Sequence, residues 1–461
     1  MQFIVIFMSF DIFILYKPII TMQNKRTEAP AALSYAHSYD EEEYPFEIAK
    51  QPPIIIGRDE EDLQKYGAKG TLALGKHIVG TGEDAHLTTP VLLDALRPHI
   101  IVITGKRGSG KSYTLATIAE ELTKLPDNIA KNLCSVIIDT QGIFWTMKTP
   151  AEKDYMLLDE WKLKPIGFNA HVYVPQGQAA VFSKANVEFD DSFSFAPYEL
   201  TAYDWINVFG LDSNKPLGML LLKVIKNLRP PYILEDIVSA IKSTHGWEEQ
   251  KPALENMFLS AEEWGIFGES KAPDVLVPGK MSIIDVSLTP ESVRALLVAL
   301  ISRKLLQERI IARRKEELAD VQLISSVRRT PLPWLMIDEA HNFLPSDSTT
   351  AATETLNKIV KEGRQPGITL VLATQRPERL HPEALSQADI LLSHRITAKS
   401  DIEALKSVMQ TYLLFDIAKY INELPKLKGT AILLDDNSER IYKIRVRPRQ
   451  SWHAGSSPVA I

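Results

Sequence analysis

Short apolar runs alternate with longer amphipathic stretches along most of the chain from residue 99 onward. Apolar residues recur at helical spacing over the longest distance in residues 289–318. The short runs are typical of buried strands, and they occupy residues 100–104, 136–139, 171–174, 282–286, 334–338, 368–374, 390–394 and 430–434. Because strands that alternate with helices form mostly parallel sheets covered on both faces, the pattern predicts an α/β fold.

This alternation is interrupted in two places. Residues 54–98 hold short apolar pieces separated by glycine, which predicts a small β element ahead of the core. Between residues 176 and 278 the pattern loosens into helical pieces, among them 215–227 and 233–243. We interpret this stretch as a helical insertion within a core domain that spans residues 99–450.

The N-terminal residues 1–53 differ from the core and are interpreted as an extension with a polar linker. The first twenty residues are apolar, but Asp11 lies in their middle and no basic residue precedes them. A signal or anchor segment normally has basic residues before its apolar run. We therefore favour a surface segment, or a translated start at Met22 that leaves residues 1–21 untranslated, over a membrane anchor.

Composition narrows the class of protein. The chain has 461 residues, of which 45% are hydrophobic and 24% are charged, enough for a large core without the composition of a disordered chain. The single cysteine, Cys134, sits in an apolar run and excludes a disulfide framework or a cysteine metal cluster, which fits a reducing cytoplasm. A net charge of −6 does not favour nucleic-acid binding, but binding depends on the local field rather than on the total.

The run at 100–104 leads directly into a glycine-rich loop and a helical stretch. The loop matches the pattern G-x-x-x-x-G-K-[ST], whose backbone N–H groups surround a polyphosphate at a helix N-terminus. Lys111 is expected to reach the β- and γ-phosphates of ATP, and the Ser112 hydroxyl to bind Mg²⁺. The residues assigned to nucleotide binding are Gly105, Lys106, Arg107, Gly108, Ser109, Gly110, Lys111, Ser112 and Tyr113.

Two acidic residues follow the apolar run at 334–338. Asp338 comes at the end of this run, where ligands lie in open α/β sheets, and Glu339 follows it. We expect Asp338 to bind Mg²⁺ together with Ser112, and Glu339 to orient and deprotonate the attacking water.

Three further residues are candidates for the reaction itself. Gln375 follows the next run and is placed to contact the γ-phosphate or its water. Arg364, in the preceding segment, and Arg395, after the run at 390–394, are alternatives for a cation that stabilises the transition state from a neighbouring subunit.

DNA contacts are less clearly marked in the sequence. Candidates are Lys148 in the segment 145–148, Arg328 and Arg329, and the Ser/Thr-rich segment 346–353, each of which also fits an ordinary exposed loop. Residues 443–449, where basic and apolar residues alternate, fit an edge strand with a charged outer face before a tail at 451–461.

Four ordered motifs together resemble the HerA/FtsK superfamily of ring-forming, DNA-pumping ATPases, and most of all its HerA-like members. They lie at 105–112, 338–341, 363–377 and 385–395, and the resemblance covers about residues 70–450. It implies a RecA-like P-loop NTPase core, a homohexamer, and ATP hydrolysis coupled to movement along double-stranded DNA. HerA-like proteins also act with a nuclease, so a nuclease or other effector is an expected partner.

Two features depart from the superfamily pattern. Few residues before the phosphate loop remain for the N-terminal β-barrel of the family. HerA proteins also often show an acidic residue after the second strand, where this chain has the segment 139–145, Asp-Thr-Gln-Gly-Ile-Phe-Trp. Alternative functions are a nucleotide-dependent ring that recruits an effector without moving on DNA, a DEAH-type helicase, because 338–341 spells that tetrapeptide, and a secretion or conjugation motor.

Overall fold

The computed structural model describes residues 52–80, 82–269, 271–322, 329–396, 399–408, 420–421 and 423–455. The expectations about residues 1–21 and about Arg328 fall outside these ranges.

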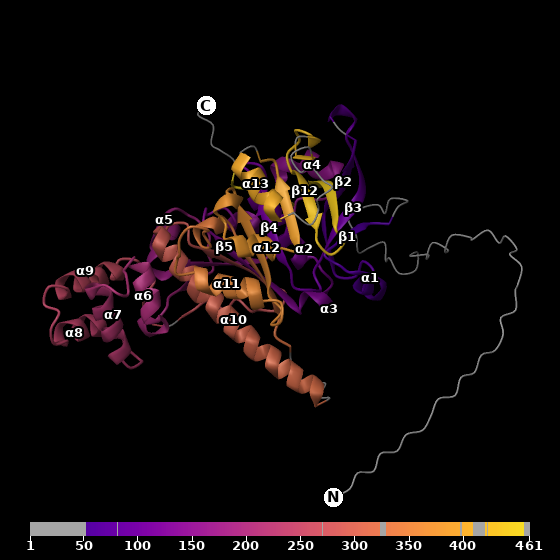
Figure 1. Cartoon of the computed structure of the whole chain (residues 1–461). Coiled ribbons are helices and arrows are strands. Elements are labelled where there is room, and N and C mark those ends of the chain that lie inside the picture. The colour runs from indigo at the N-terminus through magenta and orange to yellow at the C-terminus, as the bar shows by residue number, and fades with distance from the viewer. Residues whose placement is uncertain are drawn as a thin grey trace, which may run out of the picture. The chain divides into compact units, whose positions relative to one another are not determined.

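One sheet of thirteen strands organises the described residues (Figure 1). Its order is β1-β3-β2-β13-β12-β11-β4-β10-β9-β5-β8-β6-β7. The strands are β1 (Ile54–Ile56), β2 (Thr71–Val79), β3 (His86–Asp94), β4 (Ile100–Thr104), β5 (Leu133–Asp139), β6 (Ala170–Pro175), β7 (Asp191–Phe193), β8 (Met281–Asp285), β9 (Leu332–Ile337), β10 (Thr369–Thr374), β11 (Ile390–His394), β12 (Thr430–Asp435) and β13 (Arg440–Val446).

The strands from β11 to β7 in this order are parallel to one another. Their register is close to in line, because Thr104 of β4 lies opposite both Thr374 of β10 and Ser393 of β11. Leu372 of β10 in turn lies opposite Ile337 of β9. The carboxyl ends of β4, β10 and β9 therefore meet along one edge of the sheet, where α/β proteins bind ligands.

Helices cover both faces, because side chains alternate along each buried strand. Ile101 and Ile103 of β4 pack on one face with Leu115 of α2, and Val102 packs on the other with Leu296 of α10. The helices are α1 (Glu60–Tyr66), α2 (Lys111–Thr123), α3 (Asp127–Ala130), α4 (Tyr155–Glu160), α5 (Ala179–Lys184), α6 (Ala202–Val208), α7 (Pro216–Asn227), α8 (Leu234–Ser243), α9 (Lys251–Glu262), α10 (Glu291–Val321), α11 (Thr353–Glu362), α12 (Pro382–Ser386) and α13 (Lys399–Val408). The predicted α/β class with a mostly parallel sheet is confirmed.

The expected β element at 54–98 is part of the same sheet. β2 pairs antiparallel with β13, and β3 and β1 follow outward. The prediction that 443–449 forms an edge strand is therefore wrong, because β13 lies between β12 and β2. The predicted charged outer face is also wrong for the residues that follow β13, because Arg447 and Arg449 are fully buried.

The interrupted stretch contains α6–α9, which lie together to one side of the sheet in Figure 1. They surround aromatic residues that include Trp205, Phe209 and Phe258, with ring centroids 4.8–5.5 Å apart. Cys134 on β5 is buried, and burial raises the pKa of its thiol to about 12, so the thiol belongs to the core and lacks the low pKa of a reactive cysteine. Within the described ranges, no helix combines the length and apolar character needed to cross a membrane.

Candidate nucleotide site

The phosphate loop connects β4 to α2 and leaves its backbone in conformations that favour glycine. Gly105, Gly108 and Gly110 have φ of +153°, +73° and +119°. A Cβ on Gly105 would lie 2.4 Å from Ser109 Oγ and 2.7 Å from His394 Cβ, so only glycine fits there. The loop turns tightly, with the Ser109 N–H donating to the Lys106 carbonyl at 3.1 Å.

The charged side chains of the phosphate loop differ in their exposure. Lys111 is 6% exposed, and its Nζ lies 3.5 Å from the Lys106 carbonyl oxygen, so the ammonium bends back over the loop. Lys106 and Arg107 are exposed at the tip of the loop. The buried Oγ of Ser109 has no hydrogen-bond partner among the described residues. This arrangement, with donors turned inward and a helix N-terminus behind them, suits a polyphosphate anion.

Ser112 and Asp338 meet, although they are far apart in sequence. The Ser112 Oγ donates a hydrogen bond to Asp338 Oδ2 at 2.6 Å. Asp338 is fully buried, and burial raises the pKa of its carboxyl while the Ser112 hydrogen bond and Lys111 lower it. A hydroxyl and a carboxylate beside a phosphate loop are the oxygen ligands that Mg²⁺ takes, so the two residues fit this ion.

Glu339 is held in an unusual position beside this pair. Its φ of +52° is rare for a residue other than glycine, and such strain is concentrated at functional sites. Its carboxylate is mostly buried, and Oε2 has no hydrogen-bond partner among the described residues. Burial and the neighbouring Asp338 raise the pKa of Glu339. An unpartnered carboxylate oxygen of raised basicity is what a general base requires.

His341 and β10 support this carboxylate. His341 Nδ1 lies 3.1 Å from Thr374 Oγ1 and 3.6 Å from Glu339 Oε2. Burial lowers the pKa of His341 to about 4, so the ring is neutral at pH 7 and its contact with Glu339 is not an ion pair. The backbone of Gln375, the residue after β10, lowers the pKa of Glu339 by hydrogen bonding. Gln375 is thus beside Glu339 at the same edge of the sheet.

His394 forms the floor under the phosphate loop. Its Nε2 lies 2.8 Å from Thr114 Oγ1 on α2, and its Nδ1 lies 3.0 Å from the Thr430 carbonyl. Because a carbonyl only accepts, Nδ1 donates and Nε2 accepts from the threonine. Burial lowers the pKa of His394 to about 4, so the ring stays neutral. His394 lies in the last of the four motifs, and no role for its side chain follows from that position in the sequence.

The two arginine candidates lie at opposite edges of the sheet. Arg395 follows β11 at the edge of the phosphate loop, and its carbonyl accepts from the Lys106 N–H at 3.2 Å. Arg364 precedes β10 and therefore lies at the other edge, away from the phosphate loop of its own chain. Both side chains are exposed. Only Arg395 is close to the site within one chain.

The next strand ends carry further buried carboxylates. Asp139 ends β5 opposite Asp285 of β8. The Asp139 oxygens accept from the N–H groups of Gln141, Gly142, Ile143 and Phe144 at 2.8–3.0 Å. Burial and Asp285 raise the pKa of Asp139 to about 7. Asp139 thus organises the loop that follows β5, the segment in which the sequence departs from the superfamily pattern.

The DNA-contact candidates are partly engaged in the structure. Lys148 pairs with Asp190 at 2.7 Å, and Arg329 pairs with Asp320 at 3.4 Å at a highly exposed position. The segment 346–353 is held at its base by Thr350 Oγ1, which donates to the Phe343 carbonyl at 2.8 Å. Asp347 and Ser348 at its tip are exposed.

Comparison with known proteins gives relatives over most of the chain. It is 24% identical over 411 residues to a probable helicase of Methanocaldococcus jannaschii, covering 84% of this chain and 69% of that one. It is 22% identical over 409 residues to the DNA double-strand break repair helicase HerA of Sulfurisphaera tokodaii, covering 88% and 75%. VirB4 of Thermoanaerobacter pseudethanolicus shares the fold, with a TM-score of 0.51, 13% identity, and coverage of 83% of this chain and 97% of that one.

A family model described as "Helicase HerA, central domain" matches residues 72–305, a range that contains the phosphate loop, α2 and the helical insertion. The resemblance noted from the four motifs is therefore confirmed. The chain belongs to the HerA helicase family, and it is a P-loop ATPase with a RecA-like α/β core.

Proposed function

We propose that this protein is an ATP-driven motor that moves along double-stranded DNA as a ring of six copies. The observation that carries the proposal is the joined site of the phosphate loop, the Ser112–Asp338 pair and the unpartnered Oε2 of Glu339. The relatives named as helicases, two of them of DNA double-strand break repair, support DNA as the substrate.

In this proposal the residues of the site divide the hydrolysis of Mg-ATP among them. The loop amides and Lys111 hold the β- and γ-phosphates, and Ser112 and Asp338 hold Mg²⁺, which neutralises phosphate charge when bound. Glu339 Oε2 accepts a proton from a water whose oxygen bonds to the γ-phosphorus. The bond from that phosphorus to the β–γ bridging oxygen breaks, and ADP leaves. Gln375 orients the water or the γ-phosphate.

The same proposal assigns a cation of a neighbouring copy to the transition state. Arg364 and Arg395 are both exposed, as a group offered to another subunit must be. Removing such a cation costs about 10³–10⁵-fold in rate in related phosphoryl-transfer enzymes. ATP hydrolysis then occurs only in the assembled ring, so hydrolysis is coupled to the duplex DNA that passes through the ring.

The first experiment measures ATPase rate with and without linear duplex DNA, for the full chain and for Glu339→Gln. We expect duplex to stimulate the wild type, and Glu339→Gln to lose nearly all activity while still binding ATP. Glu308→Gln is the matched control, because Glu308 is an exposed carboxylate on α10. An ATPase rate that is the same with and without duplex DNA would contradict movement on DNA and favour a ring that recruits an effector.

The second experiment tests assembly and the shared site by mixing two inactive variants. If an arginine acts across subunits, Lys111→Ala mixed with Arg364→Ala, or with Arg395→Ala, regains activity, because some interfaces then contain both a sound pocket and a sound arginine. Lys111→Ala mixed with Glu339→Gln is the control. Both residues serve the pocket of one chain, so every pocket in this mixture lacks one of them and the mixture should stay inactive. Activity in this mixture would mean that the two residues act in different chains. Sedimentation that shows only monomers with nucleotide present would refute the ring.

A nuclease or other effector is proposed as the partner, and DNA processing or defence as the setting. Copurification of the tagged chain followed by nuclease assays on duplex ends tests this step separately from translocation.

A further inference from the structure

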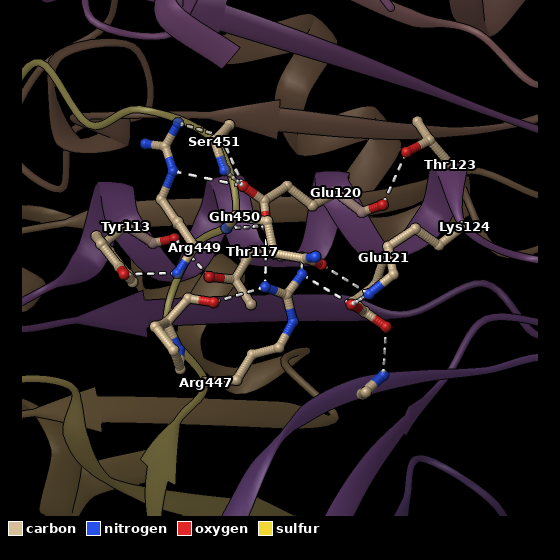
Figure 2. A network of polar contacts seen from close by, with 12 residues as sticks. Tyr113, Thr117, Glu120, Glu121, Thr123, Lys124, Arg447, Arg449, Gln450 and Ser451 are labelled. Carbon is tan, nitrogen blue, oxygen red and sulfur yellow. Dashed lines mark hydrogen bonds and ion pairs between the residues drawn. The ribbon is translucent and has the colours of Figure 1, made fainter. Parts of the chain in front are cut away.

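The residues after β13 lie along α2, the helix that begins with the phosphate loop (Figure 2). Arg447 is completely buried, and it pairs with Glu120 at 2.9 Å and with Glu121 at 2.8 Å. Ser451 Oγ donates to Glu120 Oε1 at 2.6 Å. Removing one member of such a buried pair strands a charge, so this network holds the segment firmly against the helix.

The segment also contacts the first turn of α2. Tyr113 follows Ser112 directly, and its hydroxyl accepts a hydrogen bond from the Arg449 backbone N–H at 2.5 Å, as Figure 2 shows. The Tyr113 ring meets the His453 ring at 80°, with the centroids 5.4 Å apart. Neither residue is fully buried. Two perpendicular rings therefore form a corner beside the phosphate loop.

The contacts of His453 fix where its proton lies. Arg449 Nη1 lies 3.1 Å from His453 Nδ1, and a guanidinium only donates, so Nδ1 accepts. Burial and Arg449 lower the pKa of His453 to about 4, so the ring is neutral at pH 7 and carries its hydrogen on Nε2. Within the described part of the chain, Nε2 has no hydrogen-bond acceptor, and the backbone of Gly455 packs beside the Cε1–Nε2 edge of the ring, where a Cβ would lie 2.7 Å from Nε2.

The position of this corner follows from the chemistry of the nucleotide. The loop and the first turn of α2 surround the phosphates, so the α-phosphate lies nearest the residues that follow Lys111. Ribose joins the base to that phosphate, which brings the base next to the side chain that follows Ser112. An aromatic face can stack on the base, and a ring N–H can donate a hydrogen bond to it, and neither contact involves the phosphates.

We propose that Tyr113 and His453 bind the purine base of the nucleotide, with the base stacked on one ring and His453 Nε2–H donating to a purine ring nitrogen. The C-terminal segment 447–453 is then part of the nucleotide site, held there by Glu120 and Glu121. This inference rests on the nucleotide site described above and adds the base to it.

The test compares binding of ADP and of inorganic tripolyphosphate, which lacks the base, to the full chain by calorimetry. We expect Tyr113→Leu to weaken ADP about tenfold, the loss of one stacking contact, with tripolyphosphate binding unchanged. His453→Ala loses a single hydrogen bond and should weaken ADP about fivefold. Tyr113→Phe keeps the ring and should stay close to the wild type. His86→Ala, an exposed histidine at the start of β3, is the matched control.

The outcomes separate this proposal from the function above. A wild type that binds tripolyphosphate as tightly as ADP overturns the base site but leaves the phosphate loop intact. Variants that lose both ligands together, or neither, also overturn it, because a base contact affects ADP alone. A wild type that binds neither ligand refutes the nucleotide site itself. Selective loss of ADP in both variants supports the proposal.

Discussion

His99 offers a stability prediction that can be worked out from its contacts. It precedes β4 at the edge of the sheet opposite the phosphate loop, and it is 3% exposed. Nδ1 lies 2.6 Å from Asp389 Oδ2, and Nε2 lies 3.2 Å from Asp94 Oδ2. Each ring nitrogen thus faces a carboxylate, which favours the doubly protonated imidazolium. Arg58 lies beside Asp94, and Asp435 is nearby.

These contacts set the size and the sign of the effect. The two carboxylates outweigh burial and raise the pKa of His99 from 6.5 to about 9. At 1.36 kcal/mol for each pKa unit, the charged histidine stabilises the fold by about 3 kcal/mol. Because the pKa is raised on folding, this contribution is complete below pH 6.5 and is lost as the pH rises through about 9.

The measurement is the free energy of unfolding in urea at pH 6 and at pH 9.5, for the wild type and His99→Gln. The difference between the two proteins should shrink by about 3 kcal/mol between these pH values, because only the wild type releases this proton. Comparing the two proteins cancels other groups, such as Asp139, whose pKa of about 7 also lies near this range. His86→Gln is the control. A difference that stays constant with pH would refute the charged state of His99.

Three other predictions concern the phosphate loop, the segment that follows β13, and Glu339 as the general base. Gly105→Ala should abolish ATPase activity, because its Cβ would lie 2.4 Å from Ser109 Oγ; Gly108→Ala meets no atom within 4 Å and should retain part of it, and equal losses would contradict the geometry. Arg447→Met removes the buried cation that Glu120 and Glu121 share. It should cost about 3 kcal/mol in thermal or urea unfolding, the lower end for a broken buried pair, because Lys124 still pairs with Glu121 and Ser451 still donates to Glu120. Arg440→Met, at an exposed position, should cost little. As the pH is lowered, the ATPase rate should begin to fall before pH 4.5 is reached, because burial and Asp338 raise the pKa of Glu339. A rate that stays constant down to pH 4.5 would argue against Glu339 as the general base.

Local sequence patterns were sufficient for the fold class and for the motifs of the site. The phosphate loop is contiguous, and apolar runs mark β4, β9 and β10 because their residues are buried on both faces. The same patterns were misleading at β13, where alternating basic and apolar residues suggested an edge. The partner strand β2 lies more than 350 residues earlier in the chain, as the Lys443–Gly80 contact illustrates, and no local signal announces such a pairing.

The sequence alone determined which groups could act on a nucleotide, because a phosphate loop and an acidic strand end are each defined by neighbours along the chain. Only the tertiary structure decided which groups meet. Ser112 and Asp338 are 226 positions apart, and they touch because the strand order places β10 between β4 and β9 with the carboxyl ends aligned. The C-terminal segment reaches Tyr113 for a similar reason, since Arg447 binds buried carboxylates whose partner no spacing in the sequence could reveal.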